Sequence, residues 1–433
     1  MERELEYAEE LIDFIYKSPT PFHAVDTISD MLRDNGFMEL NEEDRWEVQK
    51  NGKYFITRNN SALVAFVVGS GVIAKNGFKI IGAHTDSPTF RIKPNPEIVS
   101  EGAYLKLNTE VYGGPILNTW LDRPLALAGR VALKGKTALC PKIKLININR
   151  PILIIPNLAI HMNRNINKGI ELNKQVDMLP VLGLINDNFE KDNYLVKLLA
   201  SELNVDQEEI IDFDLVLYEY GKGCIMGANN EFVSSSRLDD LEMVHAGVSA
   251  LVKSNVSEMT NVLVCFDNEE VGSSTKQGAD SQFLSDILER IVISFGGDRE
   301  DFFRALSRSF IISSDAAHAV HPNKGEKADP TNRPHINEGP VIKINANQKY
   351  TSESNSIAVY TQICKSAGIP FQKFVNRSDE TGGSTIGPIS STHLALRSVD
   401  IGTPLLAMHS VRELCGVKDH LYVEKSFEEF YNI

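Results

Sequence analysis

The chain has 433 residues, of which 42% are hydrophobic and 24% are charged. These proportions are typical of a globular protein, and the length corresponds to two or three domains. Because 44 basic residues stand against 58 acidic ones, the formal net charge is −14. This surplus of negative charge argues against nucleic acid or an anionic membrane as the main partner, but it says nothing about the fold.

The N-terminal segment predicts an amphipathic helix, because its apolar residues from Leu5 to Ile15 recur at helical spacing. It lacks the basic start and apolar middle of a signal peptide, and no segment approaches the roughly 18 apolar residues of a membrane span. The cysteines are scattered, odd in number and without a CxxC pair, which indicates reduced, mostly buried thiols and a cytoplasmic protein. They are Cys140, Cys224, Cys265, Cys364 and Cys415.

A second helix is predicted after Thr20, which is a candidate N-cap and is followed by Pro21 at the first helical position. Gly36 is a natural stop for this helix. Apolar and β-branched residues that are bounded by turn residues then predict strands. These strands are expected at residues 53–58, 61–71 and 78–83.

The pattern of apolar and turn residues changes after Pro96. From residue 97 to residue 231, short β-branched and partly alternating runs are separated by turn residues, with one helical pattern at 193–203. This block predicts an inserted β-rich domain.

Helical patterns alternate with short apolar strands from residue 232 to the end of the chain. This alternation, together with the strands before residue 97, predicts an α/β domain with a largely parallel sheet, formed by residues 1–96 and 232–433. The helical patterns lie at residues 281–295 and 352–368. The strands are expected at residues 260–270, 307–317, 339–345, 370–375 and 403–410.

Four of the predicted strands end in residue types that bind metal ions. They lead into His84, the pair Glu269–Glu270, Asp315 and His409. In open α/β sheets, functional sites form outside the carboxyl ends of the strands. A fifth piece is Asp239, which with the next acid opens a predicted helix, although an acid there is also explained by simple capping.

Two histidines and three carboxylates form a ligand set that suits zinc, cobalt or manganese. This set is too rich for one zinc ion and would serve two ions about 3.5–4 Å apart if one carboxylate bridges them. One acid of the Glu269–Glu270 pair must then bind metal while the other accepts a proton from water. Asp86 could hold the imidazole ring of His84. Taken singly, His84 could be a structural histidine, Glu269–Glu270 a solvated loop and Asp315 a turn residue.

The sequence also resembles a known family at these residues. The segments "SPTPFHAV", "GAHTDSPTFRIKP", "WLDRPLALAGRV", "LAIHMNR", "SSRLDDL", "DNEEVGS", "SSDAAHAVHPN", "GPVIKINANQKY" and "AMHSVRE" are similar to the aspartyl aminopeptidase and vacuolar aminopeptidase I family of co-catalytic zinc metallopeptidases. They run from Ser18 to Glu413 in family order. The resemblance implies a zinc-peptidase-like domain, with a mixed, largely parallel sheet flanked by helices, and a β-rich insert at 97–231 that serves dimerisation or oligomerisation.

The resemblance further implies two zinc ions in each chain, with cobalt or manganese as possible substitutes. In this scheme Asp239 bridges the ions, Glu269 is the general base and Asp86 orients a ligand. His84 and Asp315 complete one zinc site, and Glu270 and His409 complete the other. The implied metal ligands are therefore His84, Asp239, Glu270, Asp315 and His409.

Four further residues take roles through the resemblance alone. His161 would reach the active site of a neighbouring subunit and help to hold the oxyanion. His318, Lys343 and Tyr350 would contact the substrate. The family assembles as a tetrahedral dodecamer, which implies a homo-oligomer here.

The implied function is removal of an acidic or neutral N-terminal residue from peptides that have a free N-terminus. One alternative is a metal-dependent deacylase or carboxypeptidase of the same chemistry, which a blocked N-terminus would distinguish. The other alternative is a non-catalytic peptide-binding scaffold. That alternative expects a missing ligand or base, whereas all the proposed positions carry competent side chains.

Overall fold

The computed structural model describes residues 2–185 and 193–433, which divide into two compact units. The first unit comprises residues 1–86, 223–408 and 413–433, and the second comprises residues 87–222 and 409–412. Both borders of the second unit lie earlier in the chain than the 97–231 boundaries expected from the sequence. The part of the chain that the structure describes contains no helix with the length and hydropathy needed to cross a bilayer.

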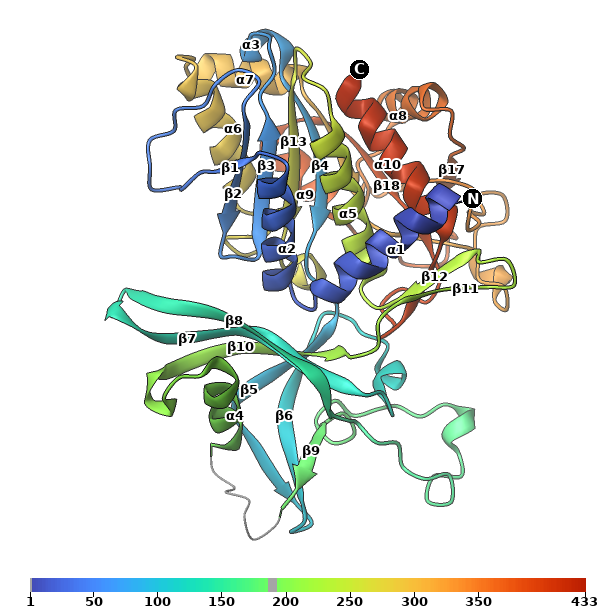
Figure 1. The fold of residues 1–433 in the computed structure, drawn as a ribbon. Helices are drawn as coiled ribbons and strands as arrows, with labels where there is room; N and C mark the ends of the chain where they lie inside the picture. The colour runs from blue at the N-terminus through green and yellow to red at the C-terminus, as the bar shows by residue number, and fades with distance from the viewer. Residues whose placement is uncertain (1, 186–192) are drawn as a thin grey trace. The chain divides into compact units, whose positions relative to one another are not determined.

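The first unit is built on a nine-stranded mixed sheet (Figure 1). Its central strands β13, β4, β14 and β18 run parallel to one another, whereas β3 and β16 are antiparallel to their inner neighbours. This arrangement confirms the α/β fold class. The strands in spatial order are β1 (Met38–Glu39), β2 (Lys53–Arg58), β3 (Ala62–Val67), β13 (Thr260–Phe266), β4 (Phe78–His84), β14 (Phe310–Ser314), β18 (Arg397–Gly402), β16 (Val341–Lys343) and β17 (Gln372–Phe374).

The central strands are buried on both faces because successive side chains point to opposite helical layers. In β4, Ile81 and Ala83 pack with one layer, whereas Phe78 and Ile80 pack with the other. One layer consists of α1 (Glu2–Lys17), α2 (Pro21–Asp34), α5 (Leu238–Lys253), α8 (Ser354–Ser366) and α10 (Val417–Asn432). The other consists of α3 (Ile73–Asn76), α6 (Phe283–Ser294), α7 (Arg299–Arg308) and α9 (Ile386–Leu394).

The start of α2 confirms the capping prediction. The side chain of Thr20 accepts a hydrogen bond from the backbone N–H of His23 at 3.3 Å, and Pro21 occupies the first helical position. The helix ends at Asp34, and Gly36 follows with a φ of +79°, a conformation that glycine adopts without steric cost.

The prediction that residues 403–410 form a strand of the main sheet is wrong. The sheet uses the preceding run, β18, and only Pro404–Leu405 forms a two-residue strand, β19, which pairs with β15 (Ala317–His318). The apolar run that ends at Met408 looked like the stronger strand because β18 carries a charged residue, Asp400, at its centre.

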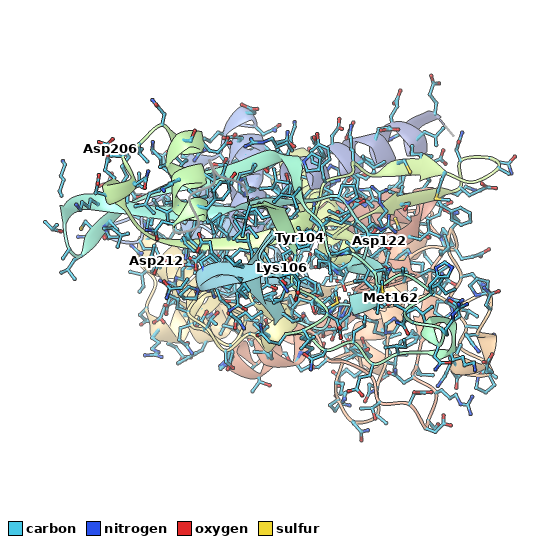
Figure 2. The ribbon with its side chains drawn as sticks, turned by 90° about the horizontal axis from the view of Figure 1, so that it is seen from below. Tyr104, Lys106, Asp122, Met162, Asp206 and Asp212 are labelled. Atoms are coloured by element: carbon cyan, nitrogen blue, oxygen red, sulfur yellow. The ribbon has the colours of Figure 1, made fainter. Side chains whose placement is uncertain are left out.

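The second unit is a six-stranded antiparallel sheet with one α-helix, α4 (Tyr194–Leu203), among its described residues. Figure 2 marks Tyr104 and Lys106 on β6 of this sheet, and Asp122 in the loop before β7. In spatial order the strands are β8 (Cys140–Leu153), β7 (Leu125–Thr137), β10 (Ile210–Glu219), β5 (Thr89–Ser100), β6 (Tyr104–Tyr112) and β9 (Val181–Leu184).

Strand β5 accounts for the difference between the border expected at residue 97 and the start of the second unit at residue 87. The strand contains Pro94 and Pro96, and proline is usually excluded from a strand interior because it lacks an N–H donor. Here the pairing of β5 with β6 shifts register between Ile92 and Glu97, so the prolines fall in an irregular stretch.

Two small sheets complete the first unit. One joins β11 (Cys224–Met226), β12 (Phe232–Ser235) and β20 (Glu413–Gly416), and the other is the β15–β19 pair. Strand β20 brings Glu413 towards the start of α5, because the carboxylate of Glu413 accepts the backbone N–H of Asp239 at 3.0 Å.

Candidate metal centre

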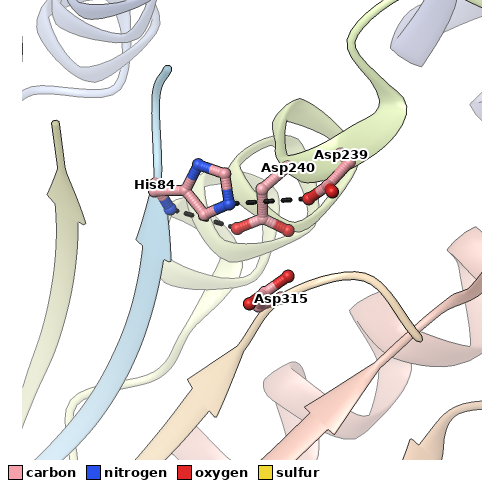
Figure 3. A group of neighbouring side chains, drawn as sticks. All are labelled: His84, Asp239, Asp240 and Asp315. Atoms are coloured by element: carbon pink, nitrogen blue, oxygen red, sulfur yellow. Dashed lines mark hydrogen bonds and ion pairs between the residues drawn. The ribbon is translucent and has the colours of Figure 1, made fainter. Parts of the chain in front are cut away.

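His84 ends β4, and its ring orientation is set by the backbone. The ring atom Nδ1 lies 3.0 Å from the carbonyl oxygen of Asp86, which can only accept a hydrogen bond. Nδ1 therefore carries the proton, and Nε2 is left as the ring atom able to bind a metal. Nε2 lies 3.5 Å from Oδ1 of Asp239 (Figure 3).

The carboxylate of Asp86 contacts both the imidazole ring of His84 and the neighbouring strand end. It lies 3.4 Å from Nδ1 of His84, a longer distance than that of the Asp86 carbonyl. Its two oxygens accept the backbone N–H groups of Glu269 and Glu270, each at 3.1 Å. The sequence predicted an orienting acid here, and the contacts add that this acid links β4 to the residues after β13.

Asp239 and Asp240 stand at the start of α5, but neither has helical backbone dihedrals, and the peptide bond between them is cis. Oδ2 of Asp240 accepts the backbone N–H of His84 at 3.0 Å, as Figure 3 shows. Oδ1 of Asp240 is buried and accepts no hydrogen bond from the described residues.

Asp315 follows β14 and completes the first cluster. His84, Asp239, Asp240 and Asp315 each offer one ligand atom, and these atoms all lie within 4.8 Å of one another. Figure 3 shows the three carboxylates around the imidazole. The sequence prediction made three of these four side chains metal ligands and gave no ligand role to Asp240, the second of the two acids at the predicted helix start.

Glu269 and Glu270 begin η4 (Glu269–Val271), the 3₁₀ turn after β13. Together with His84 they form a second group whose ligand atoms lie within 4.8 Å of one another. The strand-end argument therefore predicted their neighbourhood correctly, because β13 and β4 are adjacent and parallel from Thr260 to Phe266.

The electrostatics of the cluster favour a positive charge. Burial, together with repulsion from Asp315, Asp86 and Asp239, raises the pKa of Glu269 to about 8. Burial and neighbouring carboxylates also raise the pKa of Asp240 and Asp315. Burial alone would lower the pKa of His84, but the surrounding carboxylates outweigh it and raise this pKa well above its usual value.

These residues fit a zinc site on two observations. The donor set combines an imidazole with carboxylates, which are zinc ligand types, and the carboxylates are buried close together where a divalent cation would offset their repulsion. In addition, the buried oxygen Oδ1 of Asp240 has a lone pair that no described donor uses.

Lys343 and Tyr350 lie close to this cluster, within the first unit. The ammonium group of Lys343 donates to the carbonyl oxygens of Asp315 and Ala316 at 3.0 and 3.1 Å, and lies 3.6 Å from Oδ2 of Asp315. It also stands over the ring of Tyr350, 5.2 Å from the centroid. The ring of His318, in β15, packs edge-on against Phe374.

His161 and His409 belong to the second unit. His161 is exposed in the irregular segment between β8 and β9. Asp122, in the loop before β7, holds the start of this segment, because the carboxylate of Asp122 accepts the backbone and side-chain N–H groups of Asn157 at 2.9 and 2.7 Å. Nδ1 of His409 lies 3.1 Å from the carbonyl oxygen of Gly114 and so carries its proton there. This arrangement leaves Nε2 of His409 as the possible ligand atom.

A largely parallel α/β sheet with a buried imidazole–carboxylate cluster at its strand ends is an arrangement that suits a metal-dependent enzyme. The family model of the aminopeptidase I zinc metalloproteases (M18) matches residues 14–431. The chain therefore belongs to the M18 family and is a zinc metallo-aminopeptidase, which confirms the resemblance seen in the sequence.

Individual relatives agree with this assignment over the whole chain. A probable M18 family aminopeptidase 2 from Clostridium acetobutylicum is 74% identical over 433 residues, the full length of both chains. A chain in the cryo-EM structure of the Ape4 and Nbr1 complex is 38% identical with a TM-score of 0.95, covering 99% of this chain and 86% of that one. The S. cerevisiae mApe1 dodecamer is 29% identical with a TM-score of 0.88, covering 100% and 97% of the two chains.

Proposed function

We propose that this enzyme removes the N-terminal residue of peptides through a dinuclear zinc site with a glutamate general base. The observation that carries the proposal is the gathering of His84, Asp239 and Asp315 within 4.8 Å, with Glu269 and Glu270 grouped around the same imidazole. His84 and Asp315 would hold one ion, Glu270 and His409 the other, and Asp239 would bridge them.

Zinc, when bound, supplies a Lewis acid that polarises a peptide carbonyl and lowers the pKa of water. Glu269 accepts the proton of the attacking water and then passes it to the leaving amine. Two features of the chain support this role. Glu269 is next to the ligand Glu270, and the Asp86 carboxylate holds the backbone of both residues, so the base and the ligand keep a fixed spacing.

The remaining roles rest on the family. His161 of a neighbouring subunit would help to hold the oxyanion, where a donor is typically worth about 2.7–4 kcal/mol. His318, Lys343 and Tyr350 would line the substrate side of the site. The assembly of the related mApe1 as a dodecamer supports a homo-oligomer for this chain.

A panel of aminoacyl reporters tests the proposal on zinc-loaded protein. Reporters with Asp, Glu, Leu, Ala and Lys at a free N-terminus identify the preferred residue, and N-acetylated counterparts serve as controls. We expect turnover of acidic or neutral reporters and none of the blocked ones. Turnover of blocked reporters would show a deacylase or carboxypeptidase, and no turnover of any reporter with zinc or cobalt would favour a peptide-binding scaffold.

A further inference from the structure

Asp400 lies at the centre of β18, and its side chain is fully buried beside the metal centre's own strand, β14. Its oxygen Oδ1 accepts hydrogen bonds from the hydroxyl groups of Ser313 and Thr385, both at 2.6 Å. Its oxygen Oδ2 accepts the backbone N–H and the hydroxyl group of Thr351, at 2.6 and 2.7 Å. Four donors therefore occupy the roughly four lone-pair sites of one carboxylate.

The directions of these hydrogen bonds are determined by the chemistry of the groups. A carboxylate can only accept, so the single hydroxyl proton of Thr351 points to Asp400. The hydroxyl group of Thr351 also lies 2.7 Å from that of Ser398, which therefore belongs to the same network. A fully satisfied buried network of this kind specifies one arrangement of its members.

The four donors come from three separate segments around the candidate site. Ser313 precedes Asp315 by two residues at the end of β14. Thr351 follows Tyr350, whose ring lies under the ammonium group of Lys343. Thr385 is the N-cap of α9 and ends the loop that contains Gly382.

Two of these segments also contact each other directly. The ammonium group of Lys349 donates to the carbonyl oxygen of Gly382 at 2.5 Å, and the hydroxyl group of Ser384 donates to the carbonyl oxygen of Lys349 at 3.2 Å. The residues around Tyr350 and the loop before α9 are therefore held together, and both are attached to the sheet through Asp400.

The first turn of α9 is shaped to admit the carboxylate. A Cβ atom added at Gly387 would lie 2.5 Å from both oxygens of Asp400, closer than any real contact allows. The carboxylate thus packs against the N-terminal turn of α9, where the helix dipole favours a negative charge.

We propose that Asp400 is a positioning residue of the aminopeptidase, which holds the Tyr350 segment and the loop before α9 in fixed register with the strand end that carries Asp315. This inference rests on the proposed function. A buried carboxylate is a poor means of adding stability, because desolvation offsets most of its hydrogen-bond energy. Its particular effect here is to give three segments one mutual arrangement.

Matched threonine substitutions test the inference. Thr351→Val and Thr385→Val each remove one hydroxyl donor to Asp400 and keep the shape of the side chain, whereas Thr351→Ser and Thr385→Ser keep the donor. Thr260→Val is the control, because Thr260 is also buried in the sheet and its hydroxyl oxygen accepts the backbone N–H of Gly69 at 3.1 Å. All variants are prepared as full-length, zinc-loaded protein.

We expect the two Val variants to lose about tenfold or more in kcat/KM, with a rise in KM, and to keep the wild-type zinc content. The Ser variants should stay within about twofold of the wild type. Hydrogen exchange should accelerate at residues 381–385 in the two Val variants and stay unchanged there in Thr260→Val. Asp400→Asn turns its amide N–H₂ group towards one of the two donor pairs, so it should lose at least as much kcat/KM as the Val variants.

Three outcomes decide the matter. Reduced kcat/KM in the Val variants, with rescue by Ser, supports the inference. Wild-type kcat/KM in the Val variants, with a lowered unfolding temperature like that of Thr260→Val, overturns it and leaves the proposed function intact. An inactive wild-type protein would instead refute the proposed function.

Discussion

The carboxylate oxygen Oδ1 of Asp86 lies 3.1 Å from the backbone nitrogen of Glu269, and this contact joins the ends of two neighbouring parallel strands. Oδ2 of the same side chain accepts the N–H of Glu270 at the same distance. One buried carboxylate thus holds the backbone of both the proposed base and a proposed ligand.

Asp86→Asn should reduce kcat/KM about 10- to 100-fold, because the amide group turns an N–H donor towards one of two backbone donors. Its matched control is Asp419→Asn, since the buried carboxylate of Asp419 also accepts two backbone N–H groups, those of Asn337 and Gly339 at 2.5 and 2.8 Å. Both variants should lose stability, and only Asp86→Asn should lose activity per folded molecule. Equal activity losses would show that Asp86 contributes to folding alone.

Glu269→Gln should abolish most turnover, by about 10²–10⁴-fold, while zinc content stays at the wild-type level, because the amide cannot accept the proton of water. Glu270→Gln should instead reduce zinc content. Elemental analysis and kcat on the same samples separate the two roles. Identical zinc content in both variants would refute this division between neighbouring residues.

Removal of zinc with a chelator should lower the unfolding temperature as well as activity. Without a cation, the buried carboxylates of Asp239, Asp240 and Asp315 repel one another, and a ligand that binds only the folded state stabilises it by mass action. Calorimetry with and without chelator measures the shift, and added zinc should reverse it. Glu269→Gln should show the same shift as the wild type. An unfolding temperature that is the same with and without chelator would contradict a buried zinc site in the folded protein.

Acidification should destabilise the first unit through a buried histidine pair on α5 and α10. Nδ1 of His245 lies 2.9 Å from Nε2 of His420, and the ring of Tyr7 stacks on His420. Burial, aided by the charge of Lys253, lowers the pKa of His245 to about 3, and burial lowers the pKa of His420 well below its usual value. Lys253 forms salt bridges with Glu424, which is also buried, and with Glu428.

The sign of this effect follows from proton binding. Below pH 6.5 the unfolded chain protonates both histidines while the folded chain does not, so the free energy of unfolding falls as pH drops from about 6.5 towards 3. Each histidine contributes about 1.4 kcal/mol per pH unit. Denaturant melts between pH 7.5 and 5 measure the slope, and the double variant His245→Phe/His420→Phe should flatten it. An unchanged slope would assign the acid sensitivity to other groups.

The sequence predicts those parts of the fold in which apolar residues are buried and polar residues lie at the strand ends. Strands β4 and β13 are covered on both faces, so they read as continuous apolar runs, and the polar residues that end them were recognised as a site. Parallel neighbours place such ends together, which is why the sequence alone groups His84 with Glu269 and Glu270.

Other features could not be predicted because partners distant in the sequence decide them. Asp400 is tolerated in a central strand only because donors from three other segments meet its carboxylate. Asp240 joins the cluster through the backbone N–H of His84, a contact that no spacing indicates. Helix α7 was also not predicted, although its start carries a capping box formed by Asp298 and Asp301.

The central place of β4 has a consequence for how this enzyme should fail under stress. Its amides are paired on both sides, with β13 and β14, and its side chains are enclosed by two helical layers. Segments of this kind exchange their amide protons only through global opening. Heat inactivation should therefore coincide with cooperative melting of the whole first unit. We expect no earlier step in which the site loses its structure while the rest of the unit stays folded.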